Sequence, residues 1–226
     1  MIELLTVIAI IAILMGLLLP ALNAAKNAAR KSQAKNDITN MVTAVKAFYS
    51  EYGFYPIAPG GAAADQEYGG ANDQTGNQDV VNILRADANS ADTLSSGTAT
   101  TPISVNTREV VYLDVPLVKD NKNPKSGLSS TSTTASTIGA NKGAGVWYDP
   151  WGTPYIVTID GNYDGYVGPL ATAVLLNYSD VNYVQFNGGN AVQGGVIAGS
   201  FGADRVQGSA TNSKVFQGSD DILSWQ

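Results

Sequence analysis

The chain has 226 residues, 14% of them charged, and its formal net charge at pH 7 is −6. It contains neither cysteine nor histidine, which excludes disulfide frameworks, thiolate nucleophiles, imidazole bases and most zinc or copper sites. The length suits one domain with an appendage, and the acidic balance argues against nucleic acid as a partner.

Close to the N-terminus, an apolar run extends from Leu4 to Leu19 and is interrupted only by Thr6, two alanines and Gly16. With the three residues that follow, it approaches the length of about 20 residues that a bilayer span requires. Leaving its large side chains in water would cost roughly 1.5–3 kcal/mol each. We therefore expect this segment to lie in lipid, in the core of an assembly, or in each at different times.

Glu3 places a carboxylate at the head of that apolar run. A secretory signal peptide would begin with positive charge and carry a shorter apolar stretch. A plain membrane anchor explains the length but not the acid, because acids inside membranes are rare and usually functional. The third interpretation is a helix that packs beside copies of itself, with Glu3 paired to a neighbour's free N-terminal amine.

The periodicity predicts one α-helix over residues 1–52, because apolar residues recur at steps of three and four beyond the first run. Gly53 supplies a helix stop and Pro56 prevents resumption. Pro20 is expected to interrupt the helix, and Gly16 and Pro20 together predict local unwinding in an assembled filament. The second apolar stripe is interpreted as the seat of the globular domain, and consists of Ile38, Met41, Val42, Val45, Phe48, Tyr49 and Tyr52.

Basic residues cluster between the apolar run and an acidic body, at Lys26, Arg30, Lys31 and Lys35. A solvated helix face and a subunit-docking surface explain this cluster equally well.

Residues 57–145 read mostly as loop, because they are rich in glycine, alanine, serine, threonine and asparagine. Two segments within them have patterns of their own. Residues 79–89 predict a short helix, and residues 108–118 alternate loosely and predict a strand.

The segment YDPWGTPYIVTIDGNYDGYVG, residues 148–168, predicts a turn at Pro150 and Gly152 and then a strand through Ile159. Asp160, Asn162 and Asp164, followed by a glycine, have the spacing that opens a calcium loop. The twelfth position of that pattern is not acidic, so an EF-hand is excluded. An ordinary Asx-turn between strands explains the same residues, and both interpretations stand.

Three segments together resemble one protein family. IELLTVIAIIAILMGLLLPAL resembles the N-terminal segment of type IV pilins and, more closely, of type II secretion pseudopilins, with matches at Ile2, Glu3, Leu4 and Leu5. AVKAFYSEYGFYP is similar to the helix end of the major pseudopilins, and DPWGTPY to a segment after their variable region. The resemblance covers about residues 2–56 and 146–225.

The tail, FGADRVQGSATNSKVFQGSDDILSW, is similar to the closing segment of the same family, which encloses a calcium-binding loop. Gly202, Ala203 and Asp204 match one end, and Asp221, Ile222 and Trp225 match the other. Arg205 stands where the family usually has glycine. The resemblance implies that Asp204 and Asp221 bind calcium directly, with Asp220 as a further ligand.

The resemblance implies an α+β, pilin-like fold in which a long N-terminal helix packs on a C-terminal antiparallel sheet with long loops. The expected division is an apolar segment (1–25), the amphipathic half of the helix (26–56), a variable region (57–145) and a β-rich head (146–226). The expected function is that of a structural subunit of a helical pilus-like or pseudopilus-like filament. A minor tip or priming pseudopilin and a monomeric membrane-anchored binding domain are the alternatives.

The family also implies processing and N-methylation by a prepilin peptidase, contact with an assembly platform, and residence in the inner membrane before assembly into a periplasmic or surface filament. The positive-inside rule would place residues 26–35 in the cytoplasm, whereas the family's body faces outward, and we follow the resemblance. Catalysis is not expected, because the acids that cluster do so at calcium-like spacing and neither a GxSxG nor a P-loop pattern is present.

Overall fold

The structure is a computed structural model, and it describes residues 2–57, 64–69, 76–87, 102–130, 145–170, 173–208 and 214–226. The chain divides into two compact units, Met1–Gln33 and Ala34–Gln226. Much of the expected variable region lies outside the described residues, including most of the low-complexity stretch at 125–145.

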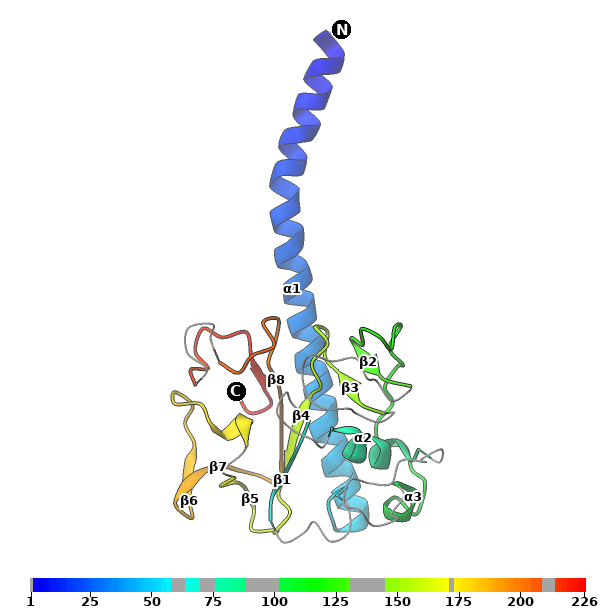
Figure 1. The fold of residues 1–226 in the computed structure, drawn as a ribbon, viewed down its shortest axis with the longest axis vertical. Helices are drawn as coiled ribbons and strands as arrows, with labels where there is room; N and C mark the ends of the chain where they lie inside the picture. Colours follow the sequence, from blue (N-terminus) through cyan, green and yellow to red (C-terminus); the bar gives the residue numbers. More distant parts are fainter. Residues whose placement is uncertain are drawn as a thin grey trace. The chain divides into compact units, whose positions relative to one another are not determined.

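Helix α1 spans Ile2–Tyr52, as the periodicity predicts, and Figure 1 shows it in blue as one coil. The expectation that Pro20 interrupts the helix is wrong for the single chain, because α1 continues through it. A proline ring removes one backbone donor and crowds the carbonyl four residues earlier. That carbonyl belongs to Gly16, which has no side chain to add to the crowding, and leucines on both sides favour the helix. Unwinding within a filament stays a prediction.

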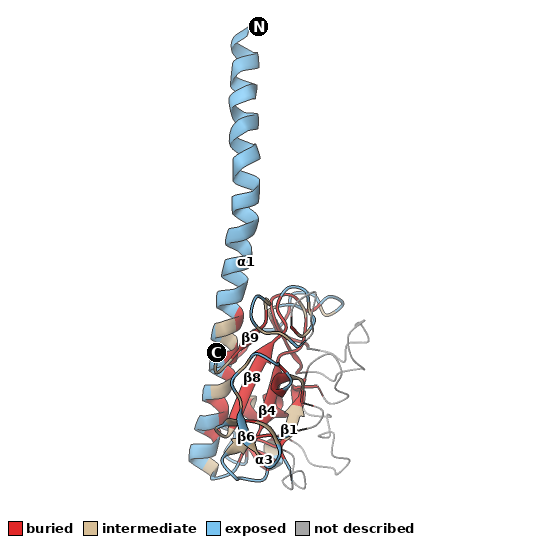
Figure 2. Cartoon of the chain, turned by 90° about the vertical axis from the view of Figure 1, so that its left-hand side faces the viewer, coloured by how far each residue is buried: buried red, intermediate tan, exposed pale blue. Residues whose placement is uncertain are grey.

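Every described residue of the first unit is exposed to solvent. Figure 2 draws this part of α1 in pale blue. Ile2 is 80% exposed, and Leu17, well along the helix, is 71% exposed. By length and composition α1 is able to cross a membrane, a test that a signal sequence near an N-terminus also passes. The expected apolar N-terminal helix is therefore present, without a partner for its apolar side chains in this unit.

The second unit contains the rest of α1, which buries one face of that helix. The fully buried residues follow each other at steps of three and four, with one neighbouring pair: Ala34, Ile38, Met41, Ala44, Val45 and Phe48. Val42 and Tyr52 are half-buried, whereas Tyr49 is 39% exposed. Apart from Tyr49, the predicted stripe thus contributes to the core. The helix ends as expected, because Gly53 adopts a φ of +74° and donates its N–H to the Tyr49 carbonyl at 2.8 Å.

Nine short strands form three antiparallel sheets in the described part of the second unit. The main sheet has the order β1-β4-β8-β9, in which neighbouring strands are hydrogen-bonded. Its strands are β1 (Gln66–Tyr68), β4 (Ile156–Ile159), β8 (Val196–Ser200) and β9 (Ile222–Leu223); β2 (Gly127–Leu128) pairs with β3 (Trp147–Tyr148), and β5 (Tyr166–Val167) and β6 (Val184–Phe186) flank β7 (Gly189–Gln193). The fold class is α+β, with the sheets C-terminal to the long helix.

The main sheet carries a separate hydrophobic core on each face. Val157 of β4 and Ala198 of β8 belong to the core that includes the buried face of α1. Ile156 and Ile197, their chain neighbours, belong to a second core with Leu175, Tyr178 and Phe201. Successive side chains of a strand point to opposite faces, so β4 and β8 are buried on both.

Three short helices complete the described elements: α2 (Gln78–Arg85), α3 (Pro102–Val105) and the 3-10 helix η1 (Val174–Leu176). Helix α2 confirms the helix expected within residues 79–89. The strand expected at 108–118 is wrong. Leu113 and Val115 are buried alternately, but the N–H groups of Tyr112 and Leu113 both donate to the carbonyl of Leu84, near the end of α2. Instead of a strand, this described segment contains one isolated β-bridge, which joins Leu117 to Leu128.

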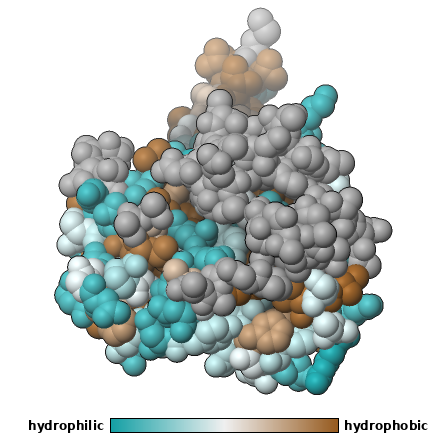
Figure 3. Space-filling view, turned by 60° about the horizontal axis from the view of Figure 1, so that its bottom comes forward, coloured by the Kyte–Doolittle hydropathy of each residue, from teal (hydrophilic) through white to brown (hydrophobic). Residues whose placement is uncertain are grey.

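Outside the first unit, no more than two consecutive residues of the described chain are exposed large apolar residues. Val111 and Leu117, in the segment between α3 and β2, and Val206, in the loop after β8, are each more than half exposed. Figure 3 shows one face of the molecule, where hydrophobic residues in brown form small areas among hydrophilic residues in teal. Single exposed apolar residues are ordinary on soluble proteins. Among the described residues, the long run of exposed apolar side chains therefore lies within residues 2–22.

Asp149 organises the turn between β3 and β4. Its Oδ1 accepts the N–H groups of Trp151, Gly152 and Thr153 at 2.7–2.9 Å, and its Oδ2 accepts the Ser200 hydroxyl at 2.7 Å. The residue is fully buried. Burial raises the pKa of Asp149 to about 6, against the lowering effect of the four hydrogen bonds.

Two substitutions of Asp149 test whether its hydrogen bonds stabilise the turn. We expect Asp149→Ala to lower the free energy of unfolding by about 3 kcal/mol, because three N–H groups lose their acceptor in a buried turn. Asp149→Asn keeps an oxygen for those groups and gains an N–H for Ser200, so its loss should be much smaller. Thermal melting of the full chain in detergent compares the two. An Asp149→Ala variant as stable as the wild type would contradict this account of the turn.

Candidate functional site

Three carboxylates meet where the two ends of the C-terminal loop come together. Asp204 follows β8, and Asp220 and Asp221 directly precede β9. These strands pair with Ser200 opposite Ile222, so both ends of the loop return to one place. One carboxylate oxygen from each acid lies within 4.8 Å of the others. The structure thus brings together the three tail residues that the sequence singles out.

Backbone conformation fixes the approach of the loop to these acids. Gly202 has a φ of +70°, and a Cβ there would lie 2.4 Å from the Asp220 carbonyl oxygen, so a side chain does not fit. Arg205 also has a positive φ, +62°. The resembling family usually has glycine at this position, which tolerates such a φ more readily. Arg205 instead donates a guanidinium N–H to the Trp151 carbonyl, which ties the loop to the β3–β4 turn.

Asp204 and Asp220 lie in the more accessible part of the cluster. Asp220 Oδ2 accepts the backbone N–H groups of Ala203 and, at 3.1 Å, of Asp204. Asp204 Oδ1 accepts the Val206 N–H at 2.9 Å. Partial burial raises the pKa of Asp204, and the negative charge of Asp220 raises it further.

Asp221 is the buried member of the cluster, with 7% of its surface exposed. Its Oδ2 accepts the Tyr178 hydroxyl at 2.7 Å and the Gly208 N–H at 2.6 Å. Its Oδ1 is buried and has no hydrogen-bond partner among the described residues. Burial raises the pKa of Asp221 to about 7; the charges of Asp220 and Asp204 add to this effect, and its hydrogen bonds oppose it.

This donor set fits a hard cation. A buried carboxylate oxygen without a partner is costly, and two further acids beside it increase the repulsion. Calcium is bound by carboxylate and carbonyl oxygens in flexible geometry, and the loop brings three carboxylates together here. The two apolar residues that match the end of the family's closing segment differ in burial. Ile222 is buried in β9, whereas Trp225 is half-buried against the second core.

The second candidate calcium loop forms a series of Asx-turns in the structure. Asp160, which is 2% exposed, accepts the N–H groups of Tyr163 at 2.6 Å and Gly165 at 3.0 Å. Asn162 accepts the N–H of Asp164, and Asp164 accepts that of Tyr166. Local hydrogen bonds therefore explain the spacing of these residues, and calcium binding by this loop stays a prediction.

Asp65 is a member of this neighbourhood that sequence reasoning missed. It is 6% exposed, and it accepts the N–H groups of Gly161, at 3.2 Å, and of Gly168. Burial raises the pKa of Asp65, and the charges of Asp160 and Asp164 add to the rise. Asp65 reaches the loop because β1 pairs with β4, with Gln66 opposite Ile159. The residues around Asp65 contain no pattern that predicts this strand pairing.

The three predicted assembly residues lie in the first unit. Glu3, Gly16 and Pro20 are exposed residues of α1. The backbone carbonyl of Glu3 accepts the Thr6 hydroxyl at 2.8 Å.

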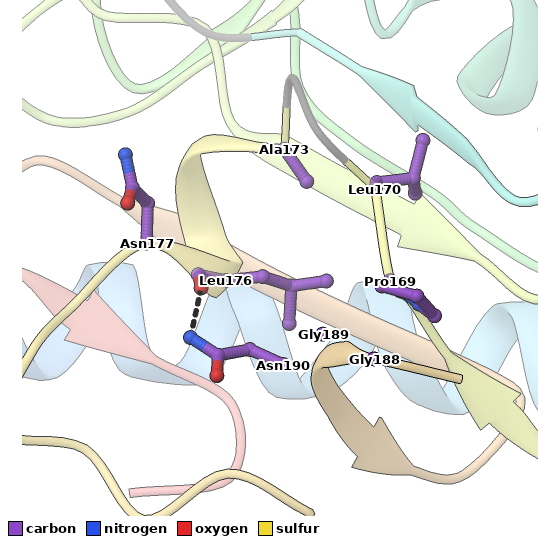
Figure 4. A pocket seen from close by; sticks show the side chains of 8 residues that line it. All are labelled: Pro169, Leu170, Ala173, Leu176, Asn177, Gly188, Gly189 and Asn190. Carbon is purple, nitrogen blue, oxygen red and sulfur yellow. Dashed lines mark hydrogen bonds between the residues drawn. The ribbon is translucent and has the colours of Figure 1, made fainter. Parts of the chain in front are cut away.

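A cavity of about 440 Å³ lies beside η1 and the turn between β6 and β7 (Figure 4). Pro169, Leu170 and Leu176 line it together with two asparagines. The Asn190 amide donates to the Leu176 carbonyl at 3.0 Å and accepts from Gln185 at 2.8 Å, so both of its ends are occupied. No charged side chain is among the described lining residues, and residues 171 and 172 lie outside the described chain. The cavity therefore does not define a ligand chemistry.

Comparison of the chain with protein-family models, with curated proteins and with solved structures finds no match.

Asp221 predicts a specific pH dependence of stability when a chelator is present. Its pKa of about 7 in the folded protein exceeds the value near 3.9 of an unfolded aspartate. The folded state then holds more protons between about pH 4 and pH 7, so stability is full below this window and falls as pH rises through it. Asp149 contributes in the same direction at a lower pH.

We expect the melting temperature in chelator to be lower at pH 7.5 than at pH 5, and the decrease to be smaller in Asp221→Asn. The variant cannot ionise at this position but keeps an oxygen for the Tyr178 hydroxyl. Equal decreases in the wild type and the variant would show that Asp221 does not titrate in this range.

Proposed function

We propose that this chain is a structural subunit of a helical filament of the type IV pilus or type II secretion pseudopilus kind, assembled from the inner membrane through its N-terminal helix. The observation that carries the proposal is the exposed apolar half of α1, with the carboxylate of Glu3 in its first turn, in a chain whose remaining described part is a compact α+β unit.

Energetics support two successive environments for this helix. Its exposed leucines, isoleucines and valines would each cost roughly 1.5–3 kcal/mol in water, a sum beyond the net stability of most domains. A bilayer removes the cost for a single chain, and neighbouring helices remove it in an assembly. Gly16 and Pro20 lie within this segment and give it the weakest stretch of helix, where unwinding would fit a long rod to a tight core.

Glu3 supplies the argument for assembly over simple anchoring. A carboxylate within an apolar core is strongly penalised when it is unpaired, whereas an amine from a neighbouring copy would compensate it. Because the pair forms only at one axial offset between two helices, Glu3 would set the register of the filament. A monomeric membrane-anchored binding domain has no comparable use for this residue.

We further propose that calcium occupies the Asp204–Asp220–Asp221 site and keeps the C-terminal loop closed. Calcium would neutralise the three acids and take the unpaired oxygen of Asp221 as a ligand. Because this loop closes against β9, an edge strand of the main sheet, the ion would protect the head of an exported filament against unfolding and proteolysis.

The assembly proposal predicts a separation between insertion and polymerisation. We expect Glu3→Leu to leave the amount of protein in the inner membrane unchanged, because the helix becomes more apolar, and to reduce the yield of sheared filaments. Electron microscopy and immunoblots of the sheared and membrane fractions measure both quantities. Thr6→Val, which changes a polar side chain one helical turn away without changing charge, is the matched control and should keep the yield.

Filaments at wild-type yield from Glu3→Leu would overturn the role of this residue. A wild-type chain that stays in the membrane and forms no filament with its assembly platform present would favour the anchored binding domain.

The calcium proposal predicts a stability change on chelation. At a calcium concentration of about 100 times the Kd, binding stabilises the folded state by about 2.7 kcal/mol, or roughly 5–10 °C for a domain of this size. We expect chelator to lower the melting temperature of the full chain in detergent and to increase proteolysis of the tail, and added calcium to reverse both effects.

Asp204→Ala should abolish this response, whereas Asp164→Ala, the matched control in the other acidic loop, should keep it. The reverse result would move the site to residues 160–165. Identical melting of the wild type in chelator and in millimolar calcium would remove calcium from the proposal.

A further inference from the structure

The segment 174–183 supports the C-terminal loop at several points. Near the start of the segment, the Val174 carbonyl accepts the Gln207 side-chain N–H at 2.7 Å. Further along, Ser179 donates its N–H and its hydroxyl to the Lys214 carbonyl, at 2.6 and 2.9 Å. Asp180 accepts the N–H groups of Phe216 and Gln217, at 2.7 and 2.6 Å, which lowers the pKa of Asp180. The described parts of the loop therefore rest on this segment both shortly after Asp204 and shortly before Asp220.

Tyr178 lies in the middle of that segment and is 2% exposed. Its ring belongs to the second core and contacts Phe216 edge to face, with centroids 5.7 Å apart. Its backbone N–H donates to the Tyr183 hydroxyl at 3.3 Å, and that hydroxyl donates to the Leu175 carbonyl at 2.8 Å. Core packing of the ring therefore sets the position of the Tyr178 hydroxyl independently of the acids, while the Tyr183 hydroxyl supports the backbone of the segment.

The hydroxyl of Tyr178 meets one oxygen of Asp221 and leaves the other without a partner. Oδ2 already accepts two hydrogen bonds, from Tyr178 and from Gly208, whereas the buried Oδ1 accepts none from the described residues. The terminal torsion of an aspartate is broad, so a carboxylate without such a partner rotates easily. A donor held rigidly on one oxygen fixes the direction of the second.

We propose that Tyr178 is a positioning residue for cation binding: by holding Oδ2 of Asp221 it reserves Oδ1 as the ligand that Asp221 gives to calcium. This inference depends on the calcium site proposed above. Hydrogen bonds that orient metal-binding carboxylates are typically worth a factor of 10–100 in metal affinity. Tyr178 acts through Asp221 and has no contact with the cation itself.

The test is calorimetric titration of the full chain in detergent with calcium chloride, comparing the wild type with Tyr178→Phe and Tyr183→Phe. Tyr178→Phe keeps the ring against Phe216 and removes one hydroxyl. Tyr183→Phe removes a hydroxyl that supports the same segment but does not touch Asp221. Melting in chelator reports the structural cost of each change separately from calcium affinity.

We expect the calcium Kd to rise by a factor of about 10–100 in Tyr178→Phe and by less than about threefold in Tyr183→Phe, with similar melting temperatures of the two variants in chelator. Wild-type affinity in Tyr178→Phe overturns the positioning role and leaves the calcium site standing. Equal weakening in both variants overturns it in favour of general support by the segment. A wild type that does not bind calcium overturns both proposals.

Discussion

The packing of one face of α1 on the main sheet is the interaction on which the second unit depends. The buried residues between Ala34 and Phe48 share a core with alternate residues of β4 and β8. Polar contacts fix the same arrangement: the Tyr155 hydroxyl donates to Asp37 at 2.8 Å, and Lys35 donates to the carbonyls of Leu223 and Gln226 at 2.7 and 2.6 Å. Since the sheet is held from this side, its far face is free to build the second core.

The acidic site is a product of that second core. Tyr178 reaches Asp221 from a segment that packs on the far face of the sheet, while the loop itself leaves from β8 and returns to β9. The site therefore combines the strands with a segment that precedes them in the chain. Lys35 of the basic cluster packs beside β9, where its ammonium group donates to the carbonyls of Leu223 and Gln226, and a docking role for the cluster stays a prediction. Lys26, Arg30 and Lys31 remain exposed.

Local pattern was sufficient for the features whose causes are local. The extent of α1, its stop at Gly53 and the turn of Asp149 depend on periodicity, glycine and proline chemistry within a few residues. The tail acids were also predictable, because a family resemblance marked both ends of the loop. The alternating pattern at residues 108–118 led to a wrong strand prediction. Side chains that are buried alternately need a core to pack against, but they do not need a neighbouring strand. Asp65 and Tyr178 were beyond sequence reasoning, because their roles come from pairings with residues 96 and 43 positions away.

Because the chain is synthesised from its N-terminus, α1 is made before the sheet that buries one of its faces. The contact between Asp37 and Tyr155 joins residues 118 positions apart, and the two central strands of the main sheet, β4 and β8, are made after that interval. At roughly 5–20 residues per second, the buried face of α1 waits about 6–24 s for its sheet. During that time polar residues on its exposed side, such as Asn36, Thr39 and Asn40, oppose aggregation. Early capture of the leading apolar segment by a bilayer would keep nascent chains apart until their heads close.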